Sequence, residues 1–550
     1  MTLRSTPCGS ADSAEPCDFI IVGAGSAGCL LADRLSASGR HRVLLIEAGG
    51  SDRHPWVRIP VGYGFTFTDA RFNWKYQTAA DAGLDGRRGY WPRGKLLGGS
   101  SSINAMVYAR GLPQDFDDWG AAGASGWSAE VAEQSYARIE RHVEWVDGQR
   151  RVRGDGALTV SDVRGEIHPF NRHFFAAAES LGWPSTDDMN GAQKEGLGAF
   201  RITTRGGWRC SSSDAFLRPA LKRANLHLVK HALVERLLFE GRRVCGVAYR
   251  LGERLIEARA GREVILSAGA INSPQLLQLS GIGPAALLAG HGIAVRADLP
   301  EVGGGLQDHL AINNYYESNE PTINQQLGPL WGRARAALEF ALTRRGPLSI
   351  GVNQIGGYFR SSPELAAPDM QLYCCPASYT TATGSAAKLD KSPGFLLSVQ
   401  PCRPTSRGRV DIASGDPRAA PLIRPNSLST EKDRADVLRG YRLIRQLLGT
   451  PALRAVTVAH RTPNILPMSD AELLADFRQR CSTNYHPSCT CRMGRDARDS
   501  VLDGRLRVHG VAGLRVVDAS AFPNVTSGNT NAPTMMLAQR GAELILADHP

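Results

Sequence analysis

The first apolar runs of the chain predict a β-α-β unit. Residues 19–22 are a continuous apolar run, and a second one follows at 43–46. Between them Ala27, Leu30 and Leu35 recur at helical spacing. Buried strands of parallel sheets read as unbroken apolar runs, so this segment predicts two parallel strands and the helix that connects them.

The pattern changes further along the chain, where short apolar segments are separated by turn residues. These segments predict the strands of a small meander: 226–230, 232–239, 244–249, 254–258 and 263–266. A helix is expected directly afterwards, with Ser273 as its capping residue and Pro274 in its first turn. Later segments predict helices at 330–342 and 433–448, a strand at 394–400, and a final strand and helix at 514–517 and 533–545.

Length and charge narrow the class of protein. A chain of 550 residues exceeds what one core normally serves, so two domains are expected. The net charge of +11 is scattered along the chain and comes without a nucleic-acid-binding motif, which argues against nucleic acid as a partner. A solvated basic surface is the simpler interpretation, and the alternative is peripheral contact with an anionic membrane that holds a quinone acceptor.

The cysteines and the first residues bear on location. Eleven cysteines at irregular spacings favour reduced thiols in a cytoplasmic protein, and no cluster of metal-binding spacing is visible. Residues 1–17 lack the apolar centre of a secretory signal and are expected to be a disordered tail. No apolar run reaches 18 residues, so no spanning helix is predicted.

A glycine triplet follows the first predicted strand. Gly23, Gly25 and Gly28 permit a tight turn, close approach of a pyrophosphate to the backbone and close helix packing, while the helix N-terminus attracts phosphate. Glu47 lies 19 residues later, at the end of the second strand, where a carboxylate can accept hydrogen bonds from a ribose. The alternative is a purely structural glycine turn, and the triplet alone does not separate NAD from FAD.

A second loop rich in glycine and serine lies at 93–104 and ends on Asn104. Its backbone can approach a flat ring without obstruction by side chains. This loop belongs to a segment, 92–111, that resembles the first motif of the glucose-methanol-choline (GMC) oxidoreductase family. Further segments resemble that family in the same order: 269–283, 485–494, 514–520 and 527–536.

The resemblance implies a fold and a division of the chain. The fold class is α/β, with a Rossmann-type FAD-binding domain and an α+β substrate-binding domain, both discontinuous in sequence. The FAD-binding domain is expected to comprise 18–160, 205–310 and 482–547. The substrate-binding domain is expected to comprise 161–204 and 311–481.

The resemblance also implies the residues that bind FAD. The adenosine and pyrophosphate end is assigned to Gly23, Gly25, Ser26, Ala27, Gly28, Glu47, Ala48 and the backbone of Val234. The ribityl and ring end is assigned to Gly98, Gly99, Asn104, Ala105, Met106, Val107, Asp518, Ala519, Asn529, Asn531 and Thr534. Some relatives bind FAD covalently through a histidine, but Ile103 stands at that position, so non-covalent FAD is expected.

Two residues carry the implied chemistry. His486 matches the family's active-site histidine, and an imidazole with an ordinary pKa near ~6.5 suits the base that takes a proton from an alcohol. Asn529 matches its partner, which hydrogen-bonds the substrate oxygen. Without the resemblance, a histidine beside a proline is more often a satisfied core residue, and His309 is interpreted as structural in that way.

The implied reaction is oxidation of a primary alcohol to an aldehyde, with hydride transfer to flavin N5 and electrons passed to a quinone-like acceptor or oxygen. Glu317 and Tyr485 are candidates for binding a cationic head group, and the alternative for Glu317 is an exposed strand residue. A choline-specific dehydrogenase, an oxygen-using alcohol oxidase, a hydroxynitrile lyase on the same fold and a protein that keeps FAD only structurally remain open alternatives.

Overall fold

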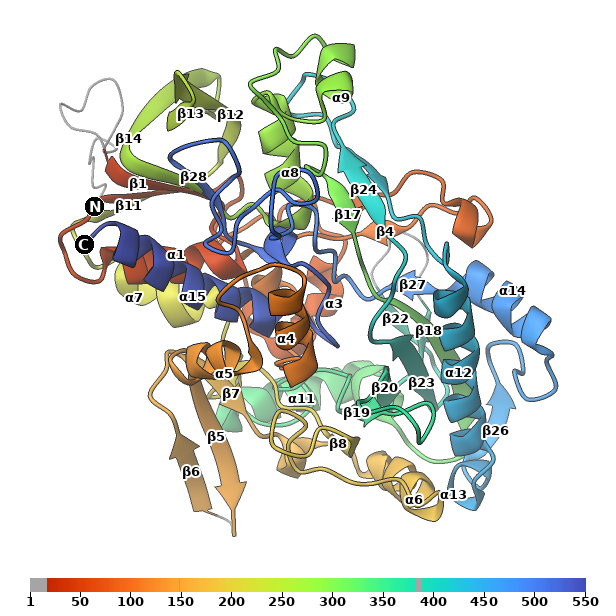
Figure 1. Ribbon diagram of the computed structural model, residues 1–550. Coiled ribbons are helices and arrows are strands. Elements are labelled where there is room, and N and C mark those ends of the chain that lie inside the picture. Colours follow the sequence, from red (N-terminus) through yellow and green to blue (C-terminus); the bar gives the residue numbers. More distant parts are fainter. Residues whose placement is uncertain (1–16, 148, 381–386) are drawn as a thin grey trace.

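The computed structural model describes residues 17–147, 149–380 and 387–550, which are arranged around two sheets (Figure 1). The expected tail lies outside these residues except for Cys17, which is the first residue of the first strand. No helix in the described ranges is both long and apolar enough to cross a membrane.

The first sheet is built from both ends of the chain. Its strands are β1 (Cys17–Val22), β2 (Val43–Ile46), β11 (Leu226–Val229), β12 (Ala232–Glu240), β13 (Arg243–Leu251), β14 (Arg254–Leu266) and β28 (Leu514–Val516). The order β11-β2-β1-β14-β28 is parallel throughout. Helices α1 (Ser26–Ser36) and α15 (Asn531–Asp548) lie together on one face, with the β12–β14 meander on the other side (Figure 1).

Strand β14 differs from the prediction, because the segments 254–258 and 263–266 form one strand rather than two. Its first half pairs antiparallel with β13, and its second half pairs parallel with β1 and β28. The register against β1 shifts between Ala260 and Glu263, around Gly261. A bulge of this kind bends a strand without ending it, so this irregularity lets one strand continue from the meander into the parallel sheet.

Helix α8 (Gly269–Leu279) begins a full turn before the predicted start, and Pro274 lies inside it. Proline has no N–H to pair with the carbonyl four residues earlier. That carbonyl, on Ala270, accepts a hydrogen bond from the Thr490 hydroxyl at 2.6 Å instead. The Ser273 hydroxyl donates to Asp518 at 2.6 Å. Contacts from the C-terminal part of the chain therefore extend the helix beyond its local signals.

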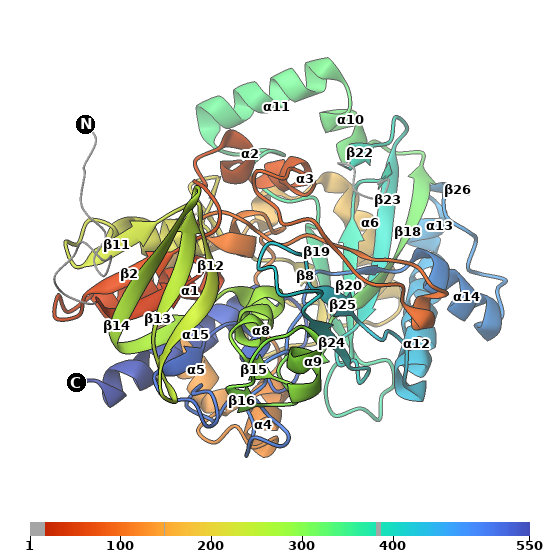
Figure 2. The same ribbon diagram turned by 90° about the horizontal axis from the view of Figure 1, so that it is seen from above.

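The second sheet is antiparallel and lies at the other side of the molecule (Figures 1 and 2). Its strands are β18 (Leu310–Ser318), β19 (Ile355–Phe359), β20 (Met370–Cys375), β23 (Gly394–Pro401), β26 (Thr457–His460) and β27 (Ser482–Thr483). Helix α12 (Glu431–Leu448) packs against β23, and α14 (Asp470–Arg480) packs against α12. Each sheet has its own large cluster of buried apolar residues. The prediction of a discontinuous α/β fold with a second α+β part is confirmed.

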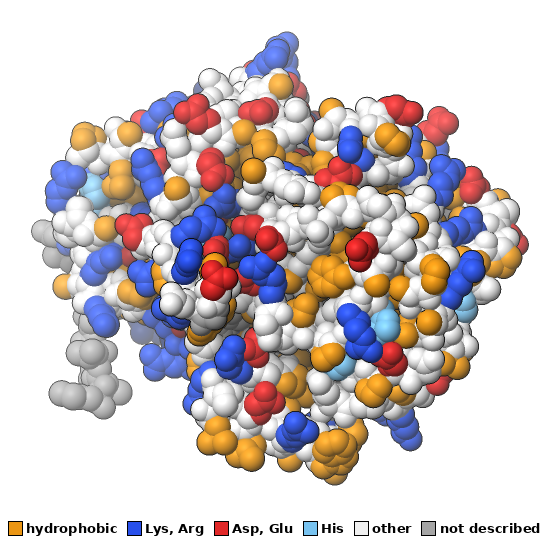
Figure 3. Space-filling view, turned by 90° about the horizontal axis from the view of Figure 1, so that it is seen from below, with side chains coloured by type: hydrophobic (Ala, Val, Ile, Leu, Met, Phe, Trp, Pro, Cys, Tyr) orange, Lys and Arg blue, Asp and Glu red, His pale blue; other side chains and the backbone are white. Residues whose placement is uncertain are grey.

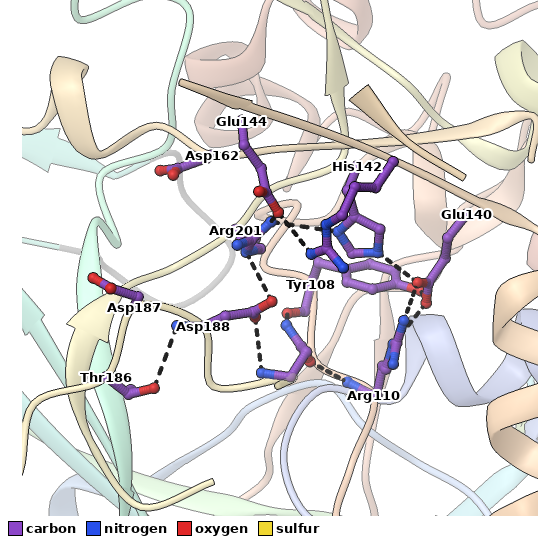
Figure 4. Close-up of polar contacts among 12 residues, drawn as sticks. Tyr108, Arg110, Glu140, His142, Glu144, Asp162, Thr186, Asp187, Asp188 and Arg201 are labelled. Atoms are coloured by element: carbon purple, nitrogen blue, oxygen red, sulfur yellow. Dashed lines mark hydrogen bonds and ion pairs between the residues drawn. The ribbon is translucent and has the colours of Figure 1, made fainter. Parts of the chain in front are cut away.

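A buried polar network ties the segment after the glycine-serine loop to a small sheet formed by β5 (Glu140–Val146), β6 (Gln149–Arg153) and β7 (Leu158–Ser161) (Figure 4). Glu140 accepts hydrogen bonds from the Tyr108 hydroxyl and from Arg110 Nε at 2.9 Å. Its other oxygen lies 2.6 Å from His142 Nε2. Burial raises the pKa of Glu140, but the bonds from His142 and Arg110 outweigh burial and hold the pKa below its ordinary value.

This network predicts unequal costs for two carboxylates that share Arg110. Glu140→Ala removes a buried acceptor and leaves Arg110 and Tyr108 without it, which should lower the free energy of unfolding by about 3–5 kcal/mol. Glu133 also pairs with Arg110, at 2.9 Å, but is 66% exposed, so Glu133→Ala should cost less than about 1 kcal/mol. Urea unfolding of the two variants measures the difference, and equal costs would contradict the assigned role of burial.

Candidate active site

One cavity of about 1820 Å³ runs from the glycine turn after β1 to the second sheet. Ligand pockets usually measure roughly 300–1,000 Å³, so this cavity has room for a large cofactor together with a second molecule. Most of the predicted site residues line it: Gly23, Gly25, Ser26, Ala27, Glu47, Ala48, Gly99, Asn104, Ala105, Met106, Val107, Val234, Tyr485, His486, Asp518, Ala519, Asn529, Asn531 and Thr534. Gly28, Gly98 and Glu317 do not line it.

The three glycines of the first turn serve different purposes. A Cβ on Gly23 or Gly28 would lie 2.6 or 1.9 Å from a backbone oxygen, so the protein's own packing requires these two glycines. A Cβ on Gly25 would meet only Ser267 O, at an ordinary 3.8 Å. Packing does not require this glycine, and it lines the cavity, so the missing side chain leaves room there for a ligand to reach the backbone.

Two helix N-termini open on the cavity. Helix α1 starts after Gly25 with no side-chain cap and no acidic residue in its first turn. Helix α15 starts after Thr530 in the same way, and Ser26 Oγ donates to Asn531 Oδ1 at 2.8 Å where the two ends meet. Uncapped N-termini carry partial positive charge and free N–H groups, which suits the pyrophosphate and the electron-rich ring of a flavin nucleotide.

Glu47 is held at the end of β2 in the same cavity. Its two oxygens accept hydrogen bonds from the backbone N–H groups of Ala24, at 2.8 Å, and Gly49, at 2.7 Å. Burial raises its pKa to about 7. These bonds hold the carboxylate in the cavity wall, where it can accept hydrogen bonds from the hydroxyl groups of a ribose. Together with the glycine turn and the helix ends, it gives a donor and acceptor set that fits FAD.

Backbone geometry presents His486 to the other end of the cavity. Strand β27, which ends three residues before His486, pairs with the start of β18, with Leu310 opposite Thr483. The ladder resumes at Gln307 opposite Ser488, so two residues before β18 face four after β27. The Asn484 N–H donates to the His309 carbonyl at 2.8 Å, which leaves Asp308 facing the three residues 485–487. His486 is in the middle of these three, and the residue opposite, Asp308, accepts its N–H at 2.7 Å. The bulge turns the imidazole toward the cavity.

Tyr485, within this bulge, has a left-handed backbone with φ of 67°. A large residue adopts this conformation only where its surroundings impose it. Its carbonyl accepts a hydrogen bond from Arg93 at 2.6 Å, and its N–H donates to Thr483 Oγ1 at 2.7 Å. Its ring packs edge-on against Phe67, with centroids 5.2 Å apart. Tyr485 thus fixes the backbone of His486 and lines the cavity beside it.

A chain of hydrogen bonds sets the tautomer of His486. His309 Nε2 lies 2.8 Å from the carbonyl oxygen of Cys402, which can only accept, so Nε2 carries a proton. Burial lowers the pKa of His309 to about 4, so the ring is neutral and its Nδ1 is an acceptor. That atom lies 2.9 Å from His486 Nδ1, which must therefore carry the proton. His486 Nε2 is left without one.

A second chain orients Asn529. Gln371 Oε1 accepts hydrogen bonds from Tyr373, at 2.9 Å, and Gln400, at 3.0 Å, which identifies it as the oxygen of that amide. The Gln371 amide nitrogen then faces Asn529 Oδ1 at 3.5 Å. Asn529 Nδ2 consequently points to His486 Nε2, 3.2 Å away. A basic nitrogen and an N–H donor thus meet at one point of the cavity.

The charge state of His486 follows from its surroundings. Burial, followed by the neighbouring His309 and Arg93, lowers the pKa of His486 well below its ordinary value. The ring is therefore neutral at pH 7 and Nε2 can accept a proton. Burial raises the pKa of Asp308 to about 6. His486 and Asn529 could take a proton from a hydroxyl group and hold its oxygen at the same time.

Glu317, a candidate for binding a cationic head group, is on β18. Its side chain is 37% exposed and lies 3.7 Å from Arg461.

Asn104, a candidate for binding the flavin ring, lines the cavity. Its Oδ1 accepts a hydrogen bond at 2.7 Å from the buried Arg209. The sequence interpretation did not include Arg209 or Gln371 in the site. A signal for Gln371 existed, since Gln371 and Gln400 are amide side chains within largely apolar segments that predict buried strands.

Comparison with known proteins agrees with this geometry. Models of the GMC oxidoreductase family match residues 17–311 and 404–538. An oxygen-dependent choline dehydrogenase from Vibrio vulnificus is 43% identical over 537 residues, which cover 97% of this chain and 95% of that protein. An alcohol dehydrogenase (acceptor) from Pseudomonas putida is 40% identical, with 96% and 95% covered.

Solved structures give the same result. The crystal structure of pyridoxine 4-oxidase from Mesorbium loti superposes with a TM-score of 0.86 and 32% identity, covering 97% of this chain and 100% of that one. A formate oxidase structure superposes with a TM-score of 0.88 and 26% identity, covering 97% and 98%. GMC enzymes bind FAD, and the resemblance noted in the sequence is confirmed. The chain belongs to the GMC oxidoreductase family and is an oxidoreductase that acts on CH–OH donors.

Proposed function

We propose that this protein oxidises an uncharged primary alcohol to an aldehyde, with His486 as the base. The observation that carries the proposal is the unprotonated Nε2 of His486 facing Asn529 Nδ2 at 3.2 Å in the cavity wall. A substrate hydroxyl beside both atoms would replace their contact with each other, donating its proton to His486 Nε2 and accepting a hydrogen bond from Asn529 Nδ2. Bound FAD supplies the hydride acceptor, N5 of its flavin ring.

The cofactor is proposed to be FAD held without a covalent bond. Its pyrophosphate would lie against Gly25 and the start of α1, and its ribose against Glu47. Asn104 and the start of α15 would contact the ring. Ile103 lines the cavity and has no nucleophilic atom with which to bond a flavin. This side chain supports the non-covalent assignment.

The lining of the cavity supports an uncharged substrate. Among the lining residues eight are Lys or Arg and three are Asp or Glu, so a quaternary ammonium ion would meet a net positive surface. Glu317, the candidate partner for such an ion, is outside the lining and close to Arg461. Choline is the second candidate, favoured by the relatives named as choline dehydrogenases.

The division into domains also remains a proposal. The buried cluster around the first sheet draws its residues from 17–46, 97–160, 210–302 and 489–545, which supports the FAD-binding domain expected from the sequence. The cluster around the second sheet draws mainly on 170–199 and 312–481. Leu84 belongs to the second cluster, so the segment around it packs on the substrate side.

The proposed reaction predicts that substrate bleaches the flavin absorption band under anaerobic conditions. The panel is straight-chain primary alcohols, an aromatic alcohol, a polyol, choline and a cyanohydrin, with aldehyde measured as product. Primary alcohols should reduce the flavin fastest, and His486→Ala should slow reduction by about 10²–10⁴-fold.

His291→Ala is the control, because His291 is a partly exposed residue just after α9 (Ala285–Gly290). Cyanohydrin cleavage without bleaching would identify a lyase, and full-rate reduction in His486→Ala would remove His486 from the mechanism. Reoxidation is followed with oxygen and with a quinone-like dye in parallel.

The pH dependence of kcat/KM follows from the lowered pKa of His486. A base works in its unprotonated form, so kcat/KM should stay level above about pH 6.5 and fall only as His486 becomes protonated below it. Asp308, with a pKa of about 6, is a second group that titrates there. Asp308→Asn removes it, and Glu47, with a pKa of about 7, is excluded by repeating the profile in Glu47→Gln, so a fall that persists in both variants belongs to His486. A midpoint above pH 7 in the unmodified enzyme would contradict the prediction.

The role assigned to His309 predicts a tautomer. In ¹⁵N spectra, His486 should show a protonated Nδ1 and an unprotonated Nε2, with assignment by loss of the signals in His486→Asn. His309→Phe removes the acceptor, so the His486 signals should shift toward a mixture of tautomers and flavin reduction should slow. His309→Asn keeps an acceptor and should restore part of both effects. Unchanged His486 signals in His309→Phe would show that His309 only fills space.

A further inference from the structure

Arg209, in β10 (Trp208–Arg209), is a buried cation that contacts the cavity wall through Asn104. Its Nε donates to the carbonyl oxygen of Val57, in α2 (Pro55–Arg58), at 2.9 Å. Its Nη1 donates to the carbonyl oxygen of Ser101 at 3.2 Å. Its Nη2 is buried and has no hydrogen-bond partner among the described residues. Backbone carbonyls carry only partial negative charge, so these contacts orient the guanidinium without neutralising it.

No acid cancels the charge of Arg209 at close range. Among the residues that the structure describes, Arg209 has no ion-pair partner. Asp214 is the carboxylate whose charge acts on it, but Asp214 already pairs with Arg58 at 2.6 Å and with Arg218 at 3.3 Å. Tyr63 is neutral, because burial raises the pKa of its hydroxyl. Burial lowers the pKa of Arg209 to about 9, so the guanidinium is still protonated at pH 7.

Arg209 also determines which way the amide of Asn104 faces. Asn104 Oδ1 accepts hydrogen bonds from Arg209 Nη1, at 2.7 Å, and from the backbone N–H of Met106, at 3.1 Å. Neither donor can accept a hydrogen bond, so this atom is the amide oxygen and both of its lone pairs are used. Asn104 lines the cavity, and its Nδ2 has no partner within the described part of the chain. Its N–H groups are therefore available to a ligand.

A buried cation of this kind acts more strongly than the charges on the surface. On the face shown in Figure 3, Lys and Arg side chains lie among Asp and Glu and are in contact with water, which screens them. Charges interact more strongly where water is excluded. When an alcohol gives its proton to His486 and a hydride to a flavin, the flavin gains one negative charge. A buried cation and a fixed N–H donor stabilise that charge.

We propose that Arg209 is a positioning residue that holds Asn104 as a hydrogen-bond donor to the flavin ring and, through its buried charge, makes bound FAD easier to reduce. The inference rests on the placement of the ring beside Asn104, which is part of the proposed function. It does not depend on which alcohol is the substrate. His486 and Arg209 then have separate tasks, since one takes the proton and the other favours the ring that has accepted the hydride.

The test is the reduction potential of bound FAD, measured anaerobically at pH 7 by equilibration with reference dyes. Arg209→Gln removes the charge but keeps an N–H donor for Asn104. Reduction should become about tenfold less favourable, which is a fall of about 30 mV for a two-electron couple.

Asn104→Asp tests the same charge in a second way. The carboxylate has the shape of the amide, pairs with Arg209 and removes the N–H donor, so the potential should fall at least as far as in Arg209→Gln. This variant gives the buried guanidinium an ion-pair partner, so it keeps the proposal testable should Arg209→Gln fail to fold.

Arg205→Gln is the matched control. Arg205 is an exposed residue of β9 (Thr204–Arg205), the strand that pairs with β10, and its loss should leave the potential unchanged. Unchanged potentials in both Arg209→Gln and Asn104→Asp, even with less FAD bound, would overturn the proposal and leave Arg209 a structural role. An equal fall in Arg205→Gln would overturn it as well. The dye measurement involves no alcohol, so an enzyme that oxidises none would contradict the proposed function without affecting this test.

Discussion

The site depends on one interruption in an antiparallel ladder, where Asp308 alone faces three residues with His486 at their centre. The ladder on both sides fixes the backbone, so the imidazole has little freedom to move. The same register places His309 beside Asn484, whose N–H donates to the His309 carbonyl at 2.8 Å. The two imidazoles can therefore share a hydrogen bond. The strain of Tyr485 is the local consequence of this arrangement, and Arg93 and Thr483 offset it.

Around His486, the positions of protons are determined by groups whose role as hydrogen-bond donor or acceptor is fixed. A backbone carbonyl only accepts, so Cys402 fixes the proton on His309 and, through it, the proton on His486. On the other side, Tyr373 and Gln400 fix the amide of Gln371 and hence that of Asn529. Burial keeps both histidines neutral. Two hydrogen-bond chains thus converge on His486 Nε2 and Asn529 Nδ2, which lie 3.2 Å apart and can both contact the oxygen of one hydroxyl group.

Local patterns predicted the parts of this structure that local forces determine. The opening β-α-β unit depends on neighbouring residues and a glycine turn, and it was predicted almost to the residue. Strand β14 and the start of α8 depend on distant partners, such as Thr490 on the Ala270 carbonyl, and were predicted wrongly. The structural interpretation of His309 missed its contact with His486, 177 residues away, because that contact depends on a strand register.

The lining of the cavity has a polar part and an apolar part. At the glycine turn it offers uncapped helix ends and the carboxylate of Glu47, which suit a charged nucleotide. Elsewhere the lining includes the apolar side chains of Trp56 and Phe65, which are 41% and 51% exposed and hold water weakly. His486 and Asn529 also line the cavity, where burial strengthens their hydrogen bonds and keeps the imidazole neutral. Apolar lining near the site therefore serves the chemistry, because fewer water molecules then compete with a substrate hydroxyl for His486 Nε2 and Asn529 Nδ2.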